Sequence, residues 1–211
     1  MSRVQNQHAY ERLRRLLIHG QIRPGIRVVE AQWARQLGVG RPALREAMMV
    51  LAHEGLLRRG ERGGYFVPIL EQTDFDQIME VRRIIEVGAI RIIGERPPDE
   101  EENARLTAVC DTMEQMLGHS LELGFAEADR RFHRVLVELS GNDRLIQLYE
   151  QAPLPLFVQP ALDPQVRIAN GKTTIDEHRT IQQLLHQRRI PQAIEALESH
   201  LLASHRYVPL P

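Results

Sequence analysis

Four residues in the second half of the sequence have types and spacings that could bind a metal ion. Asp129 and His133 are four residues apart, so on a helix both side chains would reach a single cation. His178 and His200 lie in two later helical patterns, each in register with inward-facing apolar residues. Three neutral imidazoles and one carboxylate suit zinc, nickel or a similar first-row ion, with positions left for water or a ligand carboxylate. The chain has nine histidines, so spacing alone favours a plainer interpretation, in which each is a hydrogen-bonded core or surface residue.

Arginines near the N-terminus form a second pattern, which could read DNA. Arg41 and Arg45 are four residues apart, on the side of a predicted helix opposite its apolar face. Arginine forks match the O6 and N7 acceptors of guanine, and the alternative is that both side chains are merely solvated. DNA reading is favoured because both follow a tight turn in the only strongly basic part of the chain. Residues 1–70 contain 12 Arg and 5 Asp or Glu, giving a net charge of +7, whereas the remainder carries −8.

Helical periodicity and turn residues predict a winged helix-turn-helix over residues 1–70. The first helix ends at Gly20, and the second and third helices are separated by the tight turn Gly38-Val39-Gly40. The segment from Leu56 to Val67 predicts two short strands around a charged glycine turn, which would form the wing. The second and third helices are predicted from Glu30 to Leu37 and from Arg41 to about His53.

The remainder, residues 71–211, follows a predicted linker from Pro68 to Gln72 and shows helical patterns nearly throughout. We expect an all-helical bundle of six helices and no convincing strand. The proline-rich segment from Pro153 to Gly171 predicts broken helix and loop. The six helices are predicted from Thr73 to Gly94, from Pro98 to beyond Met116, and roughly over 125–140, 143–151, 173–188 and 191–205.

Composition narrows the class of protein further. A hydrophobic content of 43% is enough for real cores, so the chain is not of the disordered class. The single cysteine excludes a disulfide framework and any multi-cysteine zinc site, which leaves His, Asp and Glu as metal ligands. No stretch is apolar enough to span a membrane or to act as a secretory signal, so a cytoplasmic location is expected.

Residues 8–68 resemble the DNA-binding half of the GntR family of bacterial repressors. The resemblance implies DNA contacts by Arg41 and Arg45, and we assign to the same surface Pro42 on that helix and Arg62, Gly63 and Gly64 in the wing. Family-like elements are Pro24-Gly25, Glu30, Leu37-Gly38-Val39, Arg41, Arg45-Glu46-Ala47, Leu51, Gly55-Leu56 and the stretch from Gly64 to Val67.

The second half resembles the FCD effector domain of the fatty-acid-regulator branch of that family. The matching segments are Asp129-Arg130-Arg131-Phe132-His133, Ser140-Gly141-Asn142, Glu177-His178-Arg179 and His200-Leu201. This resemblance implies metal ligation by Asp129, His133, His178 and His200. It also places Arg82 at the position of a pocket-facing arginine, where its fork would hold an acidic effector. The alternative for Arg82 is a surface ion pair with Glu86.

These patterns predict a ligand-responsive transcription regulator, not an enzyme. We expect a homodimeric repressor on a near-palindromic, double-stranded operator, with no membrane partner. A small carboxylate effector would bind at one divalent first-row ion per chain, with zinc or nickel favoured, and the six-helix count resembles the smaller vanillate-repressor-like group. Two alternatives are a DNA-binding dimer whose helical domain holds no metal, and a metallohydrolase that activates water.

Overall fold

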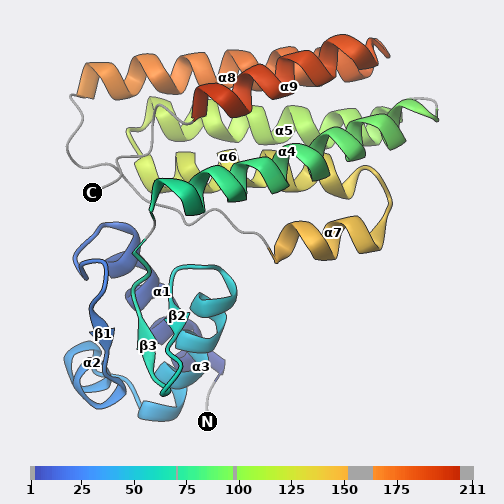
Figure 1. Cartoon of the computed structure of the whole chain (residues 1–211). Coiled ribbons are helices and arrows are strands. Elements are labelled where there is room, and N and C mark those ends of the chain that lie inside the picture. Colours follow the sequence, from blue (N-terminus) through green and yellow to red (C-terminus); the bar gives the residue numbers. More distant parts are fainter. Residues whose placement is uncertain (1–2, 70, 97–98, 152–163, 205–211) are drawn as a thin grey trace. The chain divides into compact units, whose positions relative to one another are not determined.

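A computed structural model of the chain describes residues 3–69, 71–96, 99–151 and 164–204 (Figure 1). Within these ranges the chain is mainly helical, as predicted, and divides into two compact units. The first unit reaches Thr73 and the second begins at Asp74. Buried apolar side chains cluster within each unit, so each has a core of its own.

Three helices of the first unit match the predicted order. The second helix ends at Gly38, whose φ of 65° is a left-handed conformation that glycine adopts without strain. The third helix has Pro42 in its first turn, where proline needs no hydrogen-bond donor. It packs against the first helix through the small residues Ala9, Ala43 and Ala47. The helices are α1 (Arg3–Ile18), α2 (Glu30–Leu37) and α3 (Arg41–His53).

The wing is a three-stranded antiparallel sheet in the order β1-β3-β2. Its strands are β1 (Arg27–Val28), β2 (Arg58–Arg59) and β3 (Tyr65–Phe66). The predicted hairpin is the β2–β3 pair, and β1, which the sequence pattern does not predict, adds a third strand. A strand of two residues is too short to show the alternating pattern by which strands are recognised in sequence.

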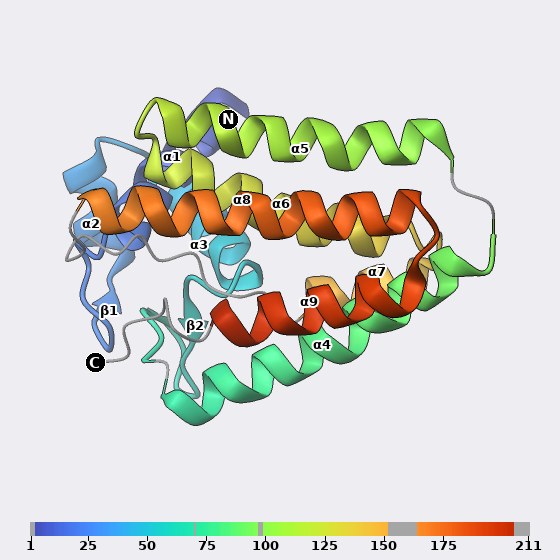
Figure 2. The same ribbon diagram turned by 90° about the horizontal axis from the view of Figure 1, so that it is seen from above.

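The second unit consists of six helices in its described part, as predicted. In this bundle α5 packs against both α6 and α8, and α8 packs against α9 (Figure 2). Asp99 caps α5 by accepting a hydrogen bond from the Glu101 amide, and Asn142 caps α7 in the same way. The helices are α4 (Gln72–Gly94), α5 (Glu100–Gly118), α6 (Glu122–Glu138), α7 (Asp143–Glu150), α8 (Pro164–His186) and α9 (Ile190–Ser204).

Helix α8 begins nine residues earlier than predicted. It starts at Pro164 and includes the stretch to Gly171 that was expected to be irregular, whereas residues 153–163 lie outside the described part. Proline is compatible with the first helical turn, so Pro164 starts the helix instead of breaking it. Thr173, the predicted start, lies inside the helix and donates its hydroxyl hydrogen to the carbonyl of Ala169.

Candidate metal centre and DNA-binding surface

The structure brings together the four residues that the sequence singled out as metal ligands. Asp129 and His133 lie one turn apart on α6, His178 lies on α8 and His200 on α9, with one ligand atom from each within 4.8 Å of the others. The three Nε2 atoms form a triangle, with 3.1 Å between His133 and His200, 3.1 Å between His178 and His200, and 3.2 Å between His178 and His133. All three histidines are buried.

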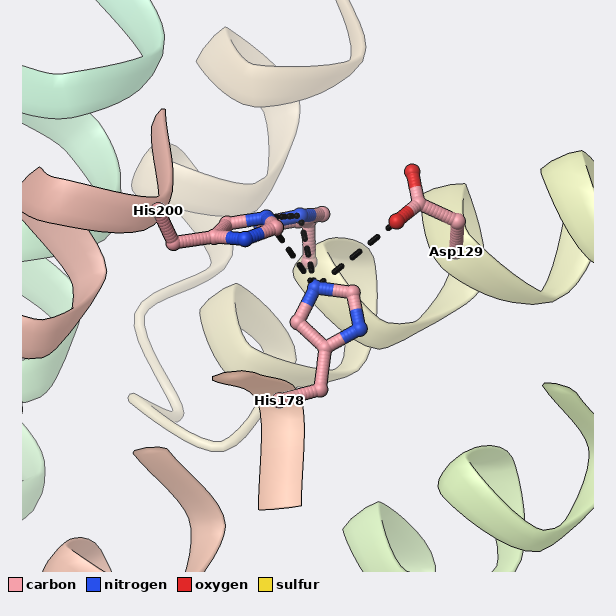
Figure 3. A group of neighbouring side chains, drawn as sticks. Asp129, His178 and His200 are labelled. Atoms are coloured by element: carbon pink, nitrogen blue, oxygen red, sulfur yellow. Dashed lines mark hydrogen bonds and ion pairs between the residues drawn. The ribbon is translucent and has the colours of Figure 1, made fainter. Parts of the chain in front are cut away.

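The carboxylate of Asp129 completes one side of this cluster. Its Oδ1 lies 3.7 Å from the Nε2 of His178, and Figure 3 shows the side chain directed toward His178 and His200. The Asp129 side chain is 35% exposed, so it is the ligand that solvent reaches. The cluster therefore has three sealed imidazoles and one accessible carboxylate.

Each imidazole has a partner on its other nitrogen. Glu86 Oε2 lies 2.7 Å from His133 Nδ1, and Glu177 Oε2 lies 2.7 Å from His200 Nδ1. Carboxylates accept hydrogen bonds, so these contacts place a proton on each Nδ1 and leave the Nε2 lone pair directed into the cluster. The Nδ1 of His178 lies 3.3 Å from the thioether of Met113, a weak acceptor that favours the same tautomer.

Burial keeps two of these rings neutral. It lowers the pKa of His133 and of His178 well below the usual value of 6.5, and the positive charge of neighbouring groups acts in the same direction. Neutral rings whose Nδ1 carries the proton have no hydrogen to share between Nε2 atoms. Their lone pairs would repel one another unless a cation lay between them.

The donor set and its spacing fit one first-row metal ion. Nitrogen ligands bonded at about 2.1 Å to one ion are separated by about 3.0 Å in an octahedron and about 3.4 Å in a tetrahedron. The observed separations of 3.1 and 3.2 Å fall between these values. The carboxylate and three imidazoles are ligands that zinc, nickel and related ions accept.

Arg82 lies beside this cluster on α4, but its surroundings differ from the surface ion pair that was considered. Its side chain is only 8% exposed, and its Nε donates to Glu86 Oε1 at 2.9 Å. The guanidinium also lies over the ring of Tyr149, 5.9 Å from the ring centre. The ion pair with Glu86 therefore exists, and the expectation of a surface position for it is wrong. Contact between Arg82 and an effector stays a prediction.

Sequence reasoning missed the residues that orient the ligands. Glu86 appeared only as a helical neighbour of Arg82, although it also contacts His133, 47 residues later in the chain. Glu177 precedes His178, yet its carboxylate reaches His200 on the next helix. An acidic residue at either position does not by itself predict a contact with a histidine, because spacing cannot show which helices become neighbours.

In the first unit, the predicted DNA-contacting residues lie on exposed or partly exposed surface. Arg41 and Arg45 are exposed on α3, as are Pro42 in its first turn and Arg62 in the turn between β2 and β3. Gly63 and Gly64 follow Arg62, with φ of 82° and 84°, a conformation that side chains make costly. These glycines therefore set the tight wing turn.

Arg45 already has a partner. Its Nε lies 3.0 Å from Glu30 Oε1, and its NH2 lies 2.7 Å from Glu30 Oε2. The hydrogen bond and charge of Arg45 lower the pKa of Glu30, so the pair is ionic at neutral pH. In the sequence Glu30 stands out only as a family-like position, because a separation of 15 positions hides its contact with Arg45.

Comparison with known protein families covers both units. Residues 5–67 match the family model described as "Bacterial regulatory proteins, gntR family", and residues 77–203 match the FCD domain. The chain belongs to the GntR family of transcriptional regulators. It combines the DNA-binding domain of that family with an FCD effector domain, so the metallohydrolase alternative is wrong. No described helix of this GntR regulator has the length and apolar character of a membrane span.

Individual relatives agree with this assignment. The HTH-type transcriptional regulator YcbG of Bacillus subtilis is 31% identical over 204 residues, which cover 90% of this chain and 84% of that protein. The HTH-type transcriptional repressor NanR of Cronobacter sakazakii is 28% identical over 183 residues, covering 77% of this chain and 69% of NanR. Among solved structures, Escherichia coli McbR/YncC has a TM-score of 0.70 at 18% identity, covering 95% of this chain and 94% of that one. At that identity the structural likeness supports the GntR fold alone.

Proposed function

We propose that this GntR regulator senses a small carboxylate at a metal ion in its FCD domain and changes its affinity for DNA in response. The observation that carries the proposal is the triangle of three Nε2 atoms 3.1 to 3.2 Å apart, with the Asp129 carboxylate beside it. Asp129, His133, His178 and His200 would hold one divalent first-row ion per chain, with zinc and nickel favoured. The ion would supply a Lewis acid that accepts an oxygen of the effector.

Arg82 is the residue that we assign to the other end of the effector. Its permanent positive charge lies in a buried setting beside the cluster, where a carboxylate is held more strongly than at the surface. The Nε–H of Arg82 donates to Glu86 and the guanidinium makes a further hydrogen bond with Tyr149, and the remaining terminal N–H groups would donate to the effector acid. Selectivity for an acid follows from this combination of a guanidinium and a cation.

The DNA-binding domain, which we assign to residues 1–70, would act as part of a homodimer in the cytoplasm. Two copies of α3 would enter successive major grooves of a near-palindromic, double-stranded operator, with Arg41 and Arg45 reading base edges. Pro42, Arg62 and the wing glycines would approach the backbone or the adjacent groove. Residues 71–211 would form the sensing and dimerising part, and repression relieved by the effector is the response we expect.

Elemental analysis of protein purified without a metal-affinity tag tests the metal centre. We expect near one first-row metal per chain in the wild type and loss of that metal in His133→Ala and His178→Ala. His186→Ala is the matched control, since His186 is exposed at the end of α8 and lies outside the cluster. Far-UV circular dichroism checks that each variant folds. A wild type that neither retains nor takes up metal would leave the alternative of a DNA-binding dimer without a metal.

The response to effector is tested by DNA binding. Metal-loaded protein and chelator-treated protein would be titrated with duplex DNA selected from a randomised pool, with and without a panel of small mono- and dicarboxylates. We expect at least one acid to change the affinity of the metal-loaded form and to leave the metal-free form unchanged, because an effector acts only through a difference in binding free energy between two states.

A further inference from the structure

Glu86 on α4 is a fully buried carboxylate that contacts two parts of the effector site at once. Its Oε1 accepts a hydrogen bond from Arg82 Nε at 2.9 Å, and its Oε2 lies 2.7 Å from His133 Nδ1. We propose that Glu86 is a positioning residue shared by the metal ligand His133 and the acid-binding Arg82, so that one carboxylate sets the geometry of both. This inference rests on the proposed function, in which metal and acid bind at these residues.

On the histidine side, Glu86 fixes both the tautomer and the orientation of the ring. With the Nδ1 proton of His133 donated to Oε2, the Nε2 lone pair faces His178 and His200, at 3.2 and 3.1 Å. A flipped ring would lose this charge-assisted bond between two buried side chains, which is costly. Carboxylate partners of this kind are general supports of metal-binding histidines. Glu86 itself is not a ligand, because both of its oxygens face other donors.

On the arginine side, Glu86 holds Arg82 through Nε alone. A guanidinium has five N–H donors; Glu86 accepts from one and Tyr149 makes a hydrogen bond with the same group, which leaves N–H donors on the terminal amino groups for an acid. The NH1 group lies 3.9 Å from the thioether of Met79, a weak acceptor that a carboxylate would readily replace. The Glu86 contact therefore anchors Arg82 at Nε, and the terminal N–H groups that Tyr149 does not use are left for an acid.

Glu177 provides a natural comparison within the same site. It makes the equivalent contact to the third ligand, with its Oε2 2.7 Å from His200 Nδ1. Its side chain is 33% exposed, and among the recorded contacts of the described residues it has none with Arg82. Substitution of Glu177 should thus disturb one imidazole only, whereas substitution of Glu86 should disturb an imidazole and the arginine together.

The test compares Glu86→Gln with Glu177→Gln by two measurements. The first is the affinity for Zn²⁺ and Co²⁺, from competition with a chelator; each variant should bind about 10- to 100-fold more weakly than the wild type. The visible spectrum of Co²⁺ reports whether the ligand set is unchanged. The second is ¹⁵N NMR of metal-free protein, which reports the tautomer of His133 and the exchange of the Arg82 Nε–H. Glu86→Gln should change both NMR signals, and Glu177→Gln should change neither.

A second variant separates positioning from a folding defect. Glu86→Gln leaves the buried Arg82 charge without its carboxylate, which by itself destabilises a protein. In the double variant Glu86→Gln with Arg82→Met both charges are gone, so folding should recover. Its metal affinity should stay as low as in Glu86→Gln, because His133 still lacks its charged carboxylate acceptor, which an amide oxygen replaces only weakly. Recovery to the wild-type affinity would assign the loss to the arginine charge and overturn the proposal.

Three further results would bear on the positioning role of Glu86. Wild-type metal affinity in Glu86→Gln would refute the role of Glu86, even though the metal centre itself stood. A Co²⁺ spectrum altered by this substitution toward fewer ligands would make Glu86 a ligand and not a positioning residue. If the wild type bound no metal, the proposed metal centre would fail, while the NMR signals of His133 and Arg82 would still show whether Glu86 holds both.

Discussion

Substitution of Arg45 by alanine should weaken specific DNA binding much more than it weakens folding. In the free protein the side chain is 61% exposed, and its recorded hydrogen bonds go to Glu30, itself 31% exposed. Ion pairs between exposed side chains contribute little to stability, so the thermal midpoint should hardly move. A lost bidentate contact to guanine, by contrast, should lower operator affinity by about 5- to 150-fold for each half-site.

The assay is fluorescence anisotropy on two labelled duplexes of equal length, one selected from a randomised pool by the wild type and one of unrelated sequence. Arg45→Ala should lose affinity for the selected duplex and retain most of its affinity for the unrelated one. Arg15→Ala, which removes an exposed arginine from α1, is the charge-matched control. Equal losses on both duplexes would mean that Arg45 contacts only phosphates, and no loss on either would refute its role in DNA binding.

A Glu30 variant tests whether the ion pair with Glu30 orients Arg45 for DNA binding. If Glu30 acts by orienting the Arg45 fork, then Glu30→Ala should reduce selectivity in the wild-type background. It should have no further effect in Arg45→Ala, since the side chain that it orients is gone. A double-mutant cycle measures this non-additivity directly. Additive losses would show that Glu30 contacts DNA or stabilises α3 independently of Arg45.

Three further predictions concern the second unit. Addition of Zn²⁺ at about 100 times its dissociation constant should stabilise chelator-treated protein by about 2.7 kcal/mol, seen as a higher midpoint in thermal unfolding; an unchanged midpoint would contradict a native-state site. Phe132→Ala should lower the free energy of unfolding, measured in urea, by about 3–5 kcal/mol, because Phe132 is fully buried. It should also weaken metal binding, because the Phe132 ring stacks on His178 with 4.0 Å between ring centres. Unchanged metal affinity would show that the stacking does not position the ligand. Because burial lowers the pKa of His133 and His178 in the folded state, the unfolded chain takes up protons first as the pH falls below about 6.5. These two histidines should therefore destabilise metal-free protein toward acid, by up to about 1.4 kcal/mol per pH unit each, while Glu86 and Asp129, whose pKa burial raises, act in the opposite direction; greater stability at pH 5.5 than at pH 7.5 would mean that the carboxylates outweigh the histidines.

Local patterns in the sequence predict features that lie within one element. The i, i+4 spacing of Asp129 and His133 places both on one face of α6, and the glycine after α2 gives the tight turn before α3. Helix periodicity likewise yields the six helices of the second unit in its described part. Each of these features depends on neighbours within a few residues, for which the physical rules are known.

Contacts between elements that are distant in the sequence cannot be predicted from local patterns and become visible only in the folded structure. Nothing in the spacing shows that α8 and α9 bring His178 and His200 to α6, so that assignment came from resemblance to a family. The contact of Glu86 with His133 and the pairing of β1 with β3 depend in the same way on tertiary packing. The late predicted start of α8 has a local cause, because proline breaks a helix in its interior but is compatible with the first turn, where Pro164 lies.

The unequal exposure of the four ligands has a kinetic consequence for any ion held there. Histidines that are at most 3% exposed cannot rotate away without opening the bundle, whereas the Asp129 side chain is 35% exposed. Exchange of the ion with the surrounding solution must then begin by release of Asp129, and a chelator would attack from that side. Asp129→Asn should accordingly shorten the residence time of the metal more than it alters the fold, and the lifetime of the loaded state would be governed by a single carboxylate.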